Sequence, residues 1–495
     1  MQAVLDILRD PSLEPAQKRQ RLASSAEDSL PRPGVGTRAQ GLLERGVLCD
    51  LFEGHAPYRP RYVLPDYARL MERGSEFLNL TPPKDLFEAL NALQIAYRFV
   101  PSITGYPVYL GAIDELLEPH WDSVDEATAT RLLEMFLVQI DRTLPDAFVH
   151  MNLGPRDSRV GRAVLRLERR LQKAIPNLSL KVDAATPESL LLEAIETALV
   201  TGKPYFVNDP VLQAEWGRPY GIASCYNTLP IGGGSHTLVR LNLARLAEGC
   251  PDAETFLQER LPEAVAAMGE LIQARTRFLV EEARFFEGSF LVREGLIHLE
   301  NFTSMAGILG LHECVENLGG GCMGRDDSAD ALAERITFKA RELVKAQPAL
   351  HCQGSGGRLG FHAQSGITDD VGTTAGVRFQ IGKEPHLFEQ IRLQARLQGA
   401  FDAGVSEIVL FDPTARRNPE GVLRIVRGAL EAGMRILALG SADSELVRIS
   451  GYLAKRSDME KARLDASLRE ETVRLAEASA RNARIGERPS RGLER

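Results

Sequence analysis

One glycine near the end of the chain lies among residues that suit one-electron chemistry. Gly451 is part of the run Arg448-Ile449-Ser450-Gly451-Tyr452. Because glycine has no Cβ, its Cα can become planar when it loses a hydrogen atom, and it tolerates unusual backbone angles. The amide groups on both sides can then delocalise the unpaired electron. A surface turn is the simpler interpretation, because Ser-Gly often marks one, so a radical role requires a partner elsewhere in the chain.

A cysteine earlier in the chain is suited to be that partner. Cys225 belongs to the run Tyr220-Gly221-Ile222-Ala223-Ser224-Cys225-Tyr226-Asn227 and precedes Gly451 by 226 residues. Its S–H bond is close in strength to a glycyl C–H bond, so a hydrogen atom can pass in either direction. Such a relay starts from the neutral thiol and benefits from burial, whereas a nucleophilic cysteine needs a depressed pKa. The ordinary alternative is a buried cysteine that packs as a small hydrophobic residue.

These two segments resemble those of glycyl-radical enzymes. The loop around Gly451 is similar to their Arg-Val-Ser-Gly-Tyr loop, and residues 220–227 are similar to the Tyr-Ala-Ile-Ala-Cys-Cys-Val-Ser stretch of pyruvate formate-lyase. Residues 178–185 and 201–209, which end in Asn208-Asp209, resemble the segment that precedes the cysteine in formate-lyases and anaerobic ribonucleotide reductases. The chain resembles most the short glycyl-radical enzymes of the YjjI type.

The resemblance implies a fold, a cofactor arrangement and a set of partners. The fold would be a ten-stranded α/β barrel, with Cys225 and Gly451 on loops that meet inside it. Gly451 would store the radical and Cys225 would relay it as a thiyl. The enzyme itself would hold no metal or organic cofactor, because a separate activase with a [4Fe-4S] cluster and S-adenosylmethionine would install the radical. A homodimer that acts on a small molecule is also implied.

Departures from the best-known branches narrow the reaction. Ser224 replaces the first of the two adjacent cysteines of pyruvate formate-lyase, which argues against acyl transfer. Asn227 stands where the diol and choline-type eliminases have a glutamate base, so another base is needed. No cysteine follows Cys352, although anaerobic ribonucleotide reductases end in a four-cysteine zinc site. We expect cleavage of a C–C or C–O bond in a small oxygenated substrate; the alternative is a reductase-like enzyme that acts on a nucleotide.

Several polar residues are candidates for contact with a substrate. They are Asn208, Asn227, His236 and Glu316. Each also has an ordinary structural interpretation, since a lone histidine is usually a satisfied core residue and a lone carboxylate is usually solvated or caps a helix.

A zinc-binding protein is the main alternative class. His312, Cys314, Cys322 and Cys352, with His351, provide the imidazole and thiolate ligands that zinc prefers. Their spacing matches no compact zinc motif. The glycines of residues 354–360 do not have the spacing of a dinucleotide-binding fingerprint either.

The elements that must position these residues alternate between helices and strands. Helices are expected at residues 84–98, 130–144 and 187–201, and strands at residues 178–182, 205–207, 407–411 and 434–439. Such alternation favours an α/β sheet or barrel. We expect a mainly helical region at residues 1–130, a barrel core with the cysteine at 131–400, and a glycyl-radical region with a helical tail at 401–495.

Composition excludes several other classes. The 495 residues carry a net charge of −8, which provides no basic excess for nucleic-acid binding. No segment approaches the roughly 20 apolar residues of a membrane span, and the first residues lack the features of a signal peptide. A cytoplasmic protein is expected, with its six cysteines as free thiols.

Overall fold

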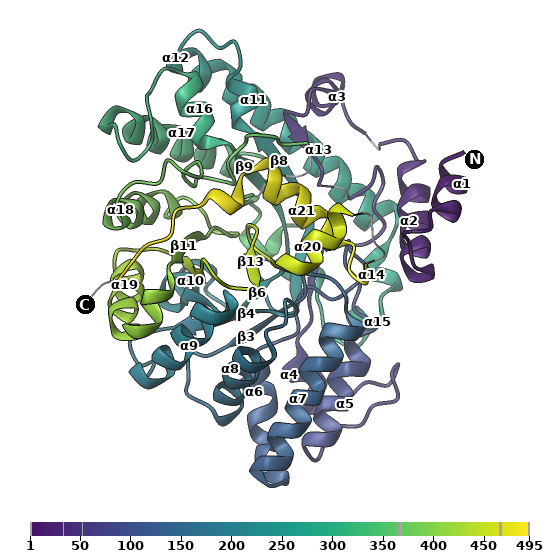
Figure 1. Cartoon of the computed structure of the whole chain (residues 1–495). Helices are drawn as coiled ribbons and strands as arrows, with labels where there is room; N and C mark the ends of the chain where they lie inside the picture. The colour runs from purple at the N-terminus through teal and green to yellow at the C-terminus, as the bar shows by residue number, and fades with distance from the viewer. Residues whose placement is uncertain are drawn as a thin grey trace.

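The computed structural model describes residues 2–493 except residues 33, 52, 365, 367–368 and 465–467. Within these residues, two five-stranded sheets lie at the centre and helices surround them (Figure 1). The two sheets together supply ten strands, and this α/β architecture agrees with the expected barrel fold. The six cysteines are free.

The first sheet is built around β8 (Gly233–Asn242), whose ten residues are all buried. β9 (Phe302–Leu309) runs parallel to β8, and β10 (Gly360–Ala363) runs parallel to β9. Two short strands from the N-terminal part, β1 (Leu48–Cys49) and β2 (Tyr62–Leu64), pair antiparallel with β8. Strands buried on both faces carry continuous apolar runs, as residues 305–309 of β9 do.

The second sheet has the order β11-β12-β5-β4-β3. Three of its strands are parallel neighbours: β3 (His150–Leu153), β4 (Asn177–Val182) and β5 (Tyr205–Asn208). β12 (Ile436–Ser441) pairs antiparallel with β5, and β11 (Glu407–Phe411) runs parallel to β12. The C-terminal part of the chain therefore completes this sheet.

Two hairpins carry the residues singled out above. β6 (Tyr220–Ala223) pairs with β7 (Asn227–Pro230), and β13 (Leu446–Arg448) pairs with β14 (Leu453–Lys455). Gly404 forms isolated bridges to Asn227 of β7 and to His362 of β10, which ties the first hairpin to the first sheet.

The longer helices pack against the outer faces of the sheets or against one another (Figure 1). They are α5 (Leu86–Tyr97), α7 (Glu126–Thr143), α8 (Arg159–Leu171), α9 (Glu188–Thr201), α13 (Leu261–Arg277), α17 (Asp327–Lys345), α18 (Leu387–Gln398) and α19 (Pro419–Glu431). Asp85, Asp125 and Ser158 begin α5, α7 and α8, and each side chain accepts a hydrogen bond from the backbone amide three residues on. Such N-caps satisfy amides that have no partner inside the helix.

The other helices connect these elements. They are α1 (Gln2–Arg9), α2 (Pro15–Asp28), α3 (Thr37–Glu44), α4 (Tyr67–Arg73), α6 (Ile113–Leu117), α10 (Asp209–Trp216), α11 (Leu243–Ala247), α12 (Ala253–Thr255), α14 (Phe285–Gly288), α15 (Phe290–Arg293), α16 (Leu311–Asn317), α20 (Arg456–Arg463) and α21 (Thr472–Asn482). None of the described helices combines the length and the apolar character of a membrane span.

The three expected regions share the two sheets. Residues 1–130 are mainly helical but also supply β1 and β2 to the first sheet. Residues 401–495 supply β11 and β12 to the second sheet, followed by the β13–β14 hairpin, α20 and α21. The boundaries themselves stay a prediction.

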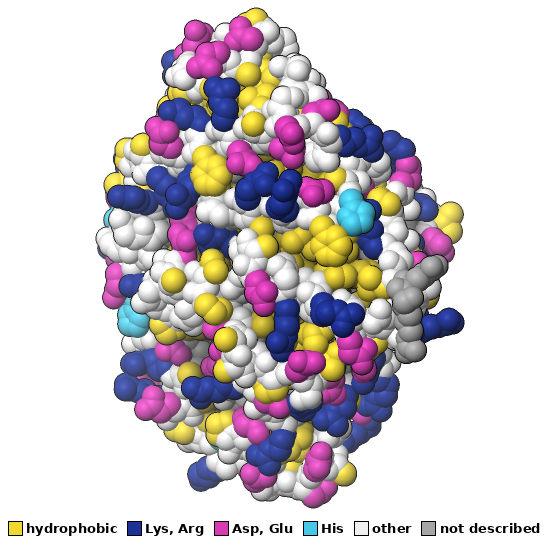
Figure 2. Space-filling model, turned by 90° about the vertical axis from the view of Figure 1, so that its left-hand side faces the viewer, with side chains coloured by type: hydrophobic (Ala, Val, Ile, Leu, Met, Phe, Trp, Pro, Cys, Tyr) yellow, Lys and Arg dark blue, Asp and Glu magenta, His cyan; other side chains and the backbone are white. Residues whose placement is uncertain are grey.

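The helix α2 near the N-terminus contacts the segment that precedes α21. The Gln17 side chain on α2 donates to the backbone oxygen of Leu468 at 2.7 Å, and Arg21 pairs with Glu471 at 2.9 Å. Figure 1 shows α2 and α21 on the same side. On the face drawn in Figure 2, acidic and basic side chains are interspersed.

Candidate active site

The turn between β6 and β7 holds Cys225 in a defined place. The Ser224 backbone amide donates to the backbone oxygen of Val108 at 2.9 Å. The Ser224 backbone oxygen accepts a hydrogen bond from His150 Nδ1 at 2.8 Å. Asn177 Nδ2 donates to the same oxygen at 3.4 Å and to the oxygen of Ala147 at 2.6 Å. Ser224 has a φ of +59°, a conformation that side chains rarely adopt. Hydrogen bonds from β3 and β4 thus hold the turn in an unusual shape.

Gly451 lies directly against this turn, at the tip of the β13–β14 hairpin. A Cβ added to Gly451 would collide with the Cβ of Cys225 and would lie 2.7 Å from its Sγ and 2.8 Å from Cδ1 of Tyr226. The side chain of any other residue would therefore displace the turn. The structure brings together the two residues that the sequence singled out.

Two arginines attach the Gly451 loop to the barrel. Arg448 donates through Nε to the oxygen of Gly202 at 3.1 Å and stacks 4.0 Å above the ring of Tyr205. Arg378 donates to the backbone oxygen of Ser450 at 3.4 Å and to the backbone oxygen of Ser406 at 2.8 Å. Both guanidiniums lie close to Cys225.

The Cys225 thiol is buried, and burial governs its protonation. Loss of solvation raises the pKa of Cys225 to about 12, although the Ser224 hydroxyl and the guanidiniums of Arg448, Arg61 and Arg378 act in the opposite direction. At neutral pH the thiol therefore keeps its hydrogen. This state suits hydrogen-atom transfer rather than nucleophilic attack.

A cavity of about 330 Å³ opens beside Cys225. Its wall includes Ser224, Cys225, Asn227, Tyr452 and Phe148. Residues of α2 and residues 469–475, from the two ends of the chain, also line it. The volume is at the lower end of the range for small-molecule sites.

Three lining residues were not identified from the sequence. His362 on β10 stacks on Tyr226, with ring centroids 5.4 Å apart, and neither of its nitrogens has a hydrogen-bond partner among the described residues. Burial lowers the pKa of His362 to about 3, so the ring is neutral. Asp146 follows α7 and accepts from the Phe148 amide at 3.0 Å, and burial raises the pKa of this carboxyl to about 6. The third residue is Arg61.

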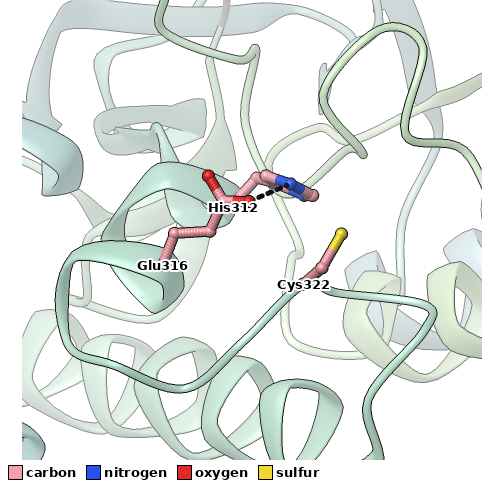
Figure 3. A group of neighbouring side chains, drawn as sticks. All are labelled: His312, Glu316 and Cys322. Carbon is pink, nitrogen blue, oxygen red and sulfur yellow. Dashed lines mark ion pairs between the residues drawn. The ribbon is translucent and has the colours of Figure 1, made fainter.

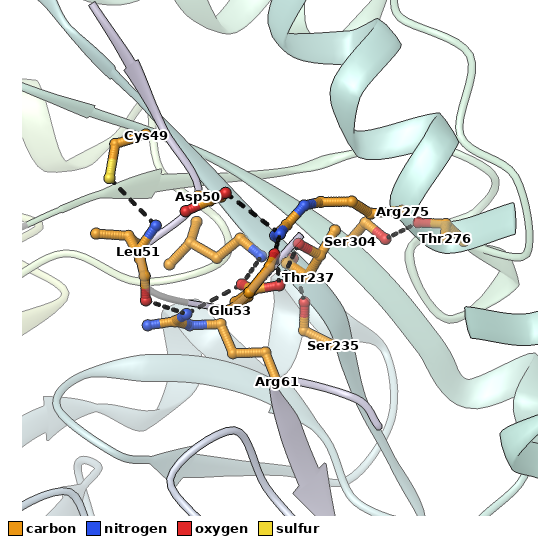
Figure 4. Close-up of polar contacts among 12 residues, drawn as sticks. Cys49, Asp50, Leu51, Glu53, Arg61, Ser235, Thr237, Arg275, Thr276 and Ser304 are labelled. Carbon is orange, nitrogen blue, oxygen red and sulfur yellow. Dashed lines mark hydrogen bonds and ion pairs between the residues drawn. The ribbon is translucent and has the colours of Figure 1, made fainter. Parts of the chain in front are cut away.

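Arg61 is held by a buried polar network (Figure 4). Its Nη1 lies 3.0 Å from Glu53 Oε1, and its Nε donates to the Tyr62 hydroxyl at 2.9 Å. Glu53 also accepts from Thr237 Oγ1 at 2.5 Å and pairs with Arg275 at 3.2 Å. The long reach from residue 53 to residue 275 explains why no local motif signals this network.

Three candidates from the sequence lie outside the cavity wall. Asn208 Nδ2 donates to the oxygens of Leu430 and Met434, at 2.8 and 3.1 Å, and so joins β5 to the segment before β12. His236 lies 3.2 Å through Nδ1 from the Ser304 hydroxyl and packs between Phe286 and Phe302. These positions do not support the predicted contact of Asn208 and His236 with a substrate in this cavity. Asn227, by contrast, lines it, and its Oδ1 has no partner among the described residues.

Glu316 is the third, and it belongs to a separate group on α16 (Figure 3). Its Oε1 lies 3.5 Å from His312 Nε2, and the group includes Cys322, with ligand atoms within 4.8 Å of one another. Neither Cys314 nor Cys352 belongs to this group, so the zinc set expected as an alternative is not assembled.

The charges around the His312 group oppose a cation. Lys383 Nζ lies 2.5 Å from Glu316 Oε1, where it neutralises the carboxylate. Arg325 adds positive charge, since it acts to lower the pKa values of both His312 and Cys322. A divalent ion would have to displace the lysine ammonium.

Comparisons with known proteins agree with the site. Residues 13–491 match the family model described as "Glycyl radical enzyme YjjI-like". The chain is 42% identical to "Uncharacterized protein YjjI" of Escherichia coli (strain K12), over 98% of this chain and 95% of that protein.

Solved structures resemble the fold at much lower identity. One concerns 1,2-propanediol dehydration in Roseburia inulinivorans, with a TM-score of 0.69, 11% identity, and coverage of 97% of this chain and 86% of that chain. Another is the anaerobic ribonucleotide reductase from Thermotoga maritima, with a TM-score of 0.64, 13% identity and coverage of 93% of each chain. Glycyl radical enzymes carry a radical on glycine without a cofactor of their own. The extent of the family match shows that this chain belongs to the YjjI-like glycyl radical enzymes.

Proposed function

We propose that Gly451 stores the radical and that Cys225 relays it as a thiyl to a small oxygenated substrate, whose C–O or C–C bond is then cleaved. The observation that carries this proposal is the direct contact of Gly451 with the Cys225 side chain. The neutral state of the buried thiol supports it, because the transferred hydrogen must be present on sulfur.

Hydrogen balance defines the cycle. The Gly451 radical takes the hydrogen of the Cys225 thiol, which restores glycine and leaves a thiyl. The thiyl takes a hydrogen atom from the substrate, and the substrate radical breaks its C–O or C–C bond. The product radical takes the hydrogen back from Cys225, and the resulting thiyl takes a hydrogen atom from Gly451, which restores the thiol and the glycyl radical. No net electron is consumed.

The cavity supports elimination more than acyl transfer. Ser224 Oγ lies 3.8 Å from Cys225 Sγ, where formate-lyases have a second thiol, and a hydroxyl is a poor acyl carrier. Asn227 uses Nδ2 to donate to the Ala223 oxygen at 3.0 Å and is no base. Asp146 lines the same cavity and is the carboxyl we propose for proton transfer, since a pKa of about 6 suits acid–base work near neutrality.

The proposal includes partners and a setting. A radical S-adenosylmethionine activase with a [4Fe-4S] cluster would generate the radical, and the β13–β14 loop would have to leave the barrel to meet it. We also propose a cytoplasmic, oxygen-sensitive homodimer with no metal or organic cofactor of its own. The cavity lies at the lower end of the size range of small-molecule sites, which favours a small metabolite over the larger nucleotide of the reductase-like alternative.

Electron paramagnetic resonance of the anaerobically activated protein tests the proposal. We expect a carbon-centred doublet in the wild type and in Cys225→Ser, and no such signal in Gly451→Ala. Gly428→Ala is the matched control, because a Cβ there meets no atom within 4 Å, and it should keep the doublet. An unchanged doublet in Gly451→Ala would exclude this glycine as the radical site.

A further inference from the structure

The charges around the cavity are unbalanced in a way that points to the substrate. Three arginines and two carboxylates form one network: Arg61 and Arg275 contact Glu53 at 3.0 and 3.2 Å, while Arg275 and Arg32 contact Asp50 at 3.3 and 3.0 Å. Figure 4 shows Arg61 and Arg275 on two sides of Glu53. One positive charge is therefore left over in a largely buried network.

Arg61 presents this charge to the cavity. Its Nε is used by Tyr62, and its Nη1 is used by Glu53 and by the Leu51 oxygen at 3.3 Å. Its Nη2 has no acceptor among the residues that the structure describes, and Arg61 lines the cavity. A guanidinium held in this way has two N–H groups in a fixed position for an oxyanion.

The potential at Cys225 has the same sign. The charged groups that act most strongly on its thiol are the guanidiniums of Arg448, Arg61 and Arg378. Positive groups around a site of low solvation attract an anion more strongly than they would in water.

Two other lining residues, His362 and Asn227, add hydrogen-bonding capacity without negative charge. His362 is neutral, and its two nitrogens lack partners in the described part of the chain, as does Oδ1 of Asn227. Buried polar atoms normally have partners, so several orphans around one cavity indicate a polar ligand. The wall also holds two carboxyls: Asp146, whose pKa burial raises to about 6, and Glu471, which is paired with Arg21.

We propose that the substrate is a small organic carboxylate that also carries a hydroxyl group, with its carboxylate on Arg61 and its remaining polar groups near His362, Asn227 and Asp146. This assignment rests on the proposed function of the same cavity. It names a chemical class, a small hydroxycarboxylate, which a cavity of about 330 Å³ accommodates.

Binding to the unactivated protein tests the assignment without the radical. The probes are two matched pairs that differ only in a carboxylate for a CH2OH group: glycerate with glycerol, and lactate with 1,2-propanediol. Isothermal titration and thermal unfolding at up to 50 mM probe should show binding of at least one carboxylate, at least tenfold tighter than its matched alcohol. Equal or tighter binding of the alcohols, or no binding of either carboxylate, would overturn the proposal.

Variants locate the binding group. Arg61→Gln should weaken carboxylate binding at least tenfold, and Arg61→Lys should restore part of it. Arg131→Gln, at an exposed arginine of α7 outside the cavity wall, is the control. Unchanged carboxylate binding by folded Arg61→Gln would remove Arg61 from the site. If that variant does not fold, the comparison of matched probes on the wild type still decides the substrate class. A doublet that persists unchanged in Gly451→Ala would refute the radical site, whereas these titrations do not depend on that signal.

Discussion

The hairpin that carries Cys225 and the hairpin that carries Gly451 meet at one point but are held differently. The backbone of the Cys225 turn bonds to β3, to β4 and to the segment at Val108. The Gly451 loop is attached through two arginine side chains, and the Ser450 hydroxyl is buried with no partner among the described residues. The strands of the Gly451 hairpin have three residues each and, within the described part of the chain, pair only with each other.

The difference matches the two tasks. A relay must hold its sulfur in one position beside the substrate, so a turn fixed by buried hydrogen bonds is suitable. A glycine that an activase must reach needs a segment that opens locally, and such segments have few buried backbone bonds. The comparison predicts that the Cys225 turn opens only when the whole protein unfolds and that the Gly451 loop opens earlier.

Asp146 lines the cavity to which Cys225 and Tyr452 of the two hairpins also contribute. Of the substitutions considered, that of Asp146 should change the free energy of unfolding most. Its pKa of about 6 in the folded protein exceeds the ordinary 3.8, so the folded state binds more protons between these values and loses stability as the pH rises through them. Asp146→Asn should raise the free energy of unfolding at pH 7.5 by as much as about 3 kcal/mol.

The gain should vanish below about pH 3, where the carboxyl is protonated in both states. Urea unfolding at the two pH values measures it. A variant that is destabilised at pH 7.5 would show that the carboxylate is stabilised by its surroundings and is not poised for proton transfer.

Asn177 tests whether buried hydrogen bonds hold the Cys225 turn in place. It is fully buried and donates to the oxygens of Ala147 and Ser224. Asn177→Ala leaves both oxygens without this donor and should lower the free energy of unfolding by about 2 kcal/mol. Asn91→Ala, at an exposed position of α5, should change it by less than about 0.5 kcal/mol. Equal effects in thermal unfolding would contradict the assigned role of Asn177.

Arg378 tests whether the Gly451 loop opens separately from the Cys225 turn. Its substitution should have the smallest effect on free energy of the three. Arg378→Gln removes the contact with the Ser450 oxygen, so local opening of the Gly451 loop should become easier by about 1 kcal/mol. Hydrogen exchange followed by mass spectrometry should become several-fold faster in residues 446–455 and stay unchanged in residues 220–230. Equal acceleration in both segments would mean that the two hairpins open together.

The sequence predicted the pair at the centre of the site but little of its wall. Cys225 and Gly451 could be recognised because each lies in a short run whose neighbours constrain it. Strands such as β11, expected at residues 407–411 and found at Glu407–Phe411, follow from continuous apolar runs. His362 and Asp146 come from segments far apart along the chain, and neither lies in a distinctive run, so their convergence depends on the tertiary fold.

Asn208 and His236, which lie outside the cavity wall, show the same limit of prediction from sequence. Asn208 was singled out with Asp209 near the cysteine, yet its amide secures the backbone between two strands. His236 lies on β8, where successive side chains point to opposite faces of the sheet. Its side chain points into an aromatic cluster rather than toward Cys225. One sequence cannot show which face of a strand a residue occupies when both faces are buried.

The contact between Gly451 and Cys225 also distinguishes the two α-hydrogens of the glycine. In free glycine they are mirror-related, but here the one in the position of a Cβ points at the Cys225 side chain, and the other points away. A hydrogen that passes directly between carbon and sulfur is therefore the first of the two. Stereospecific deuterium labelling of Gly451 would distinguish them, because the chiral fold decides which of two chemically identical atoms can travel.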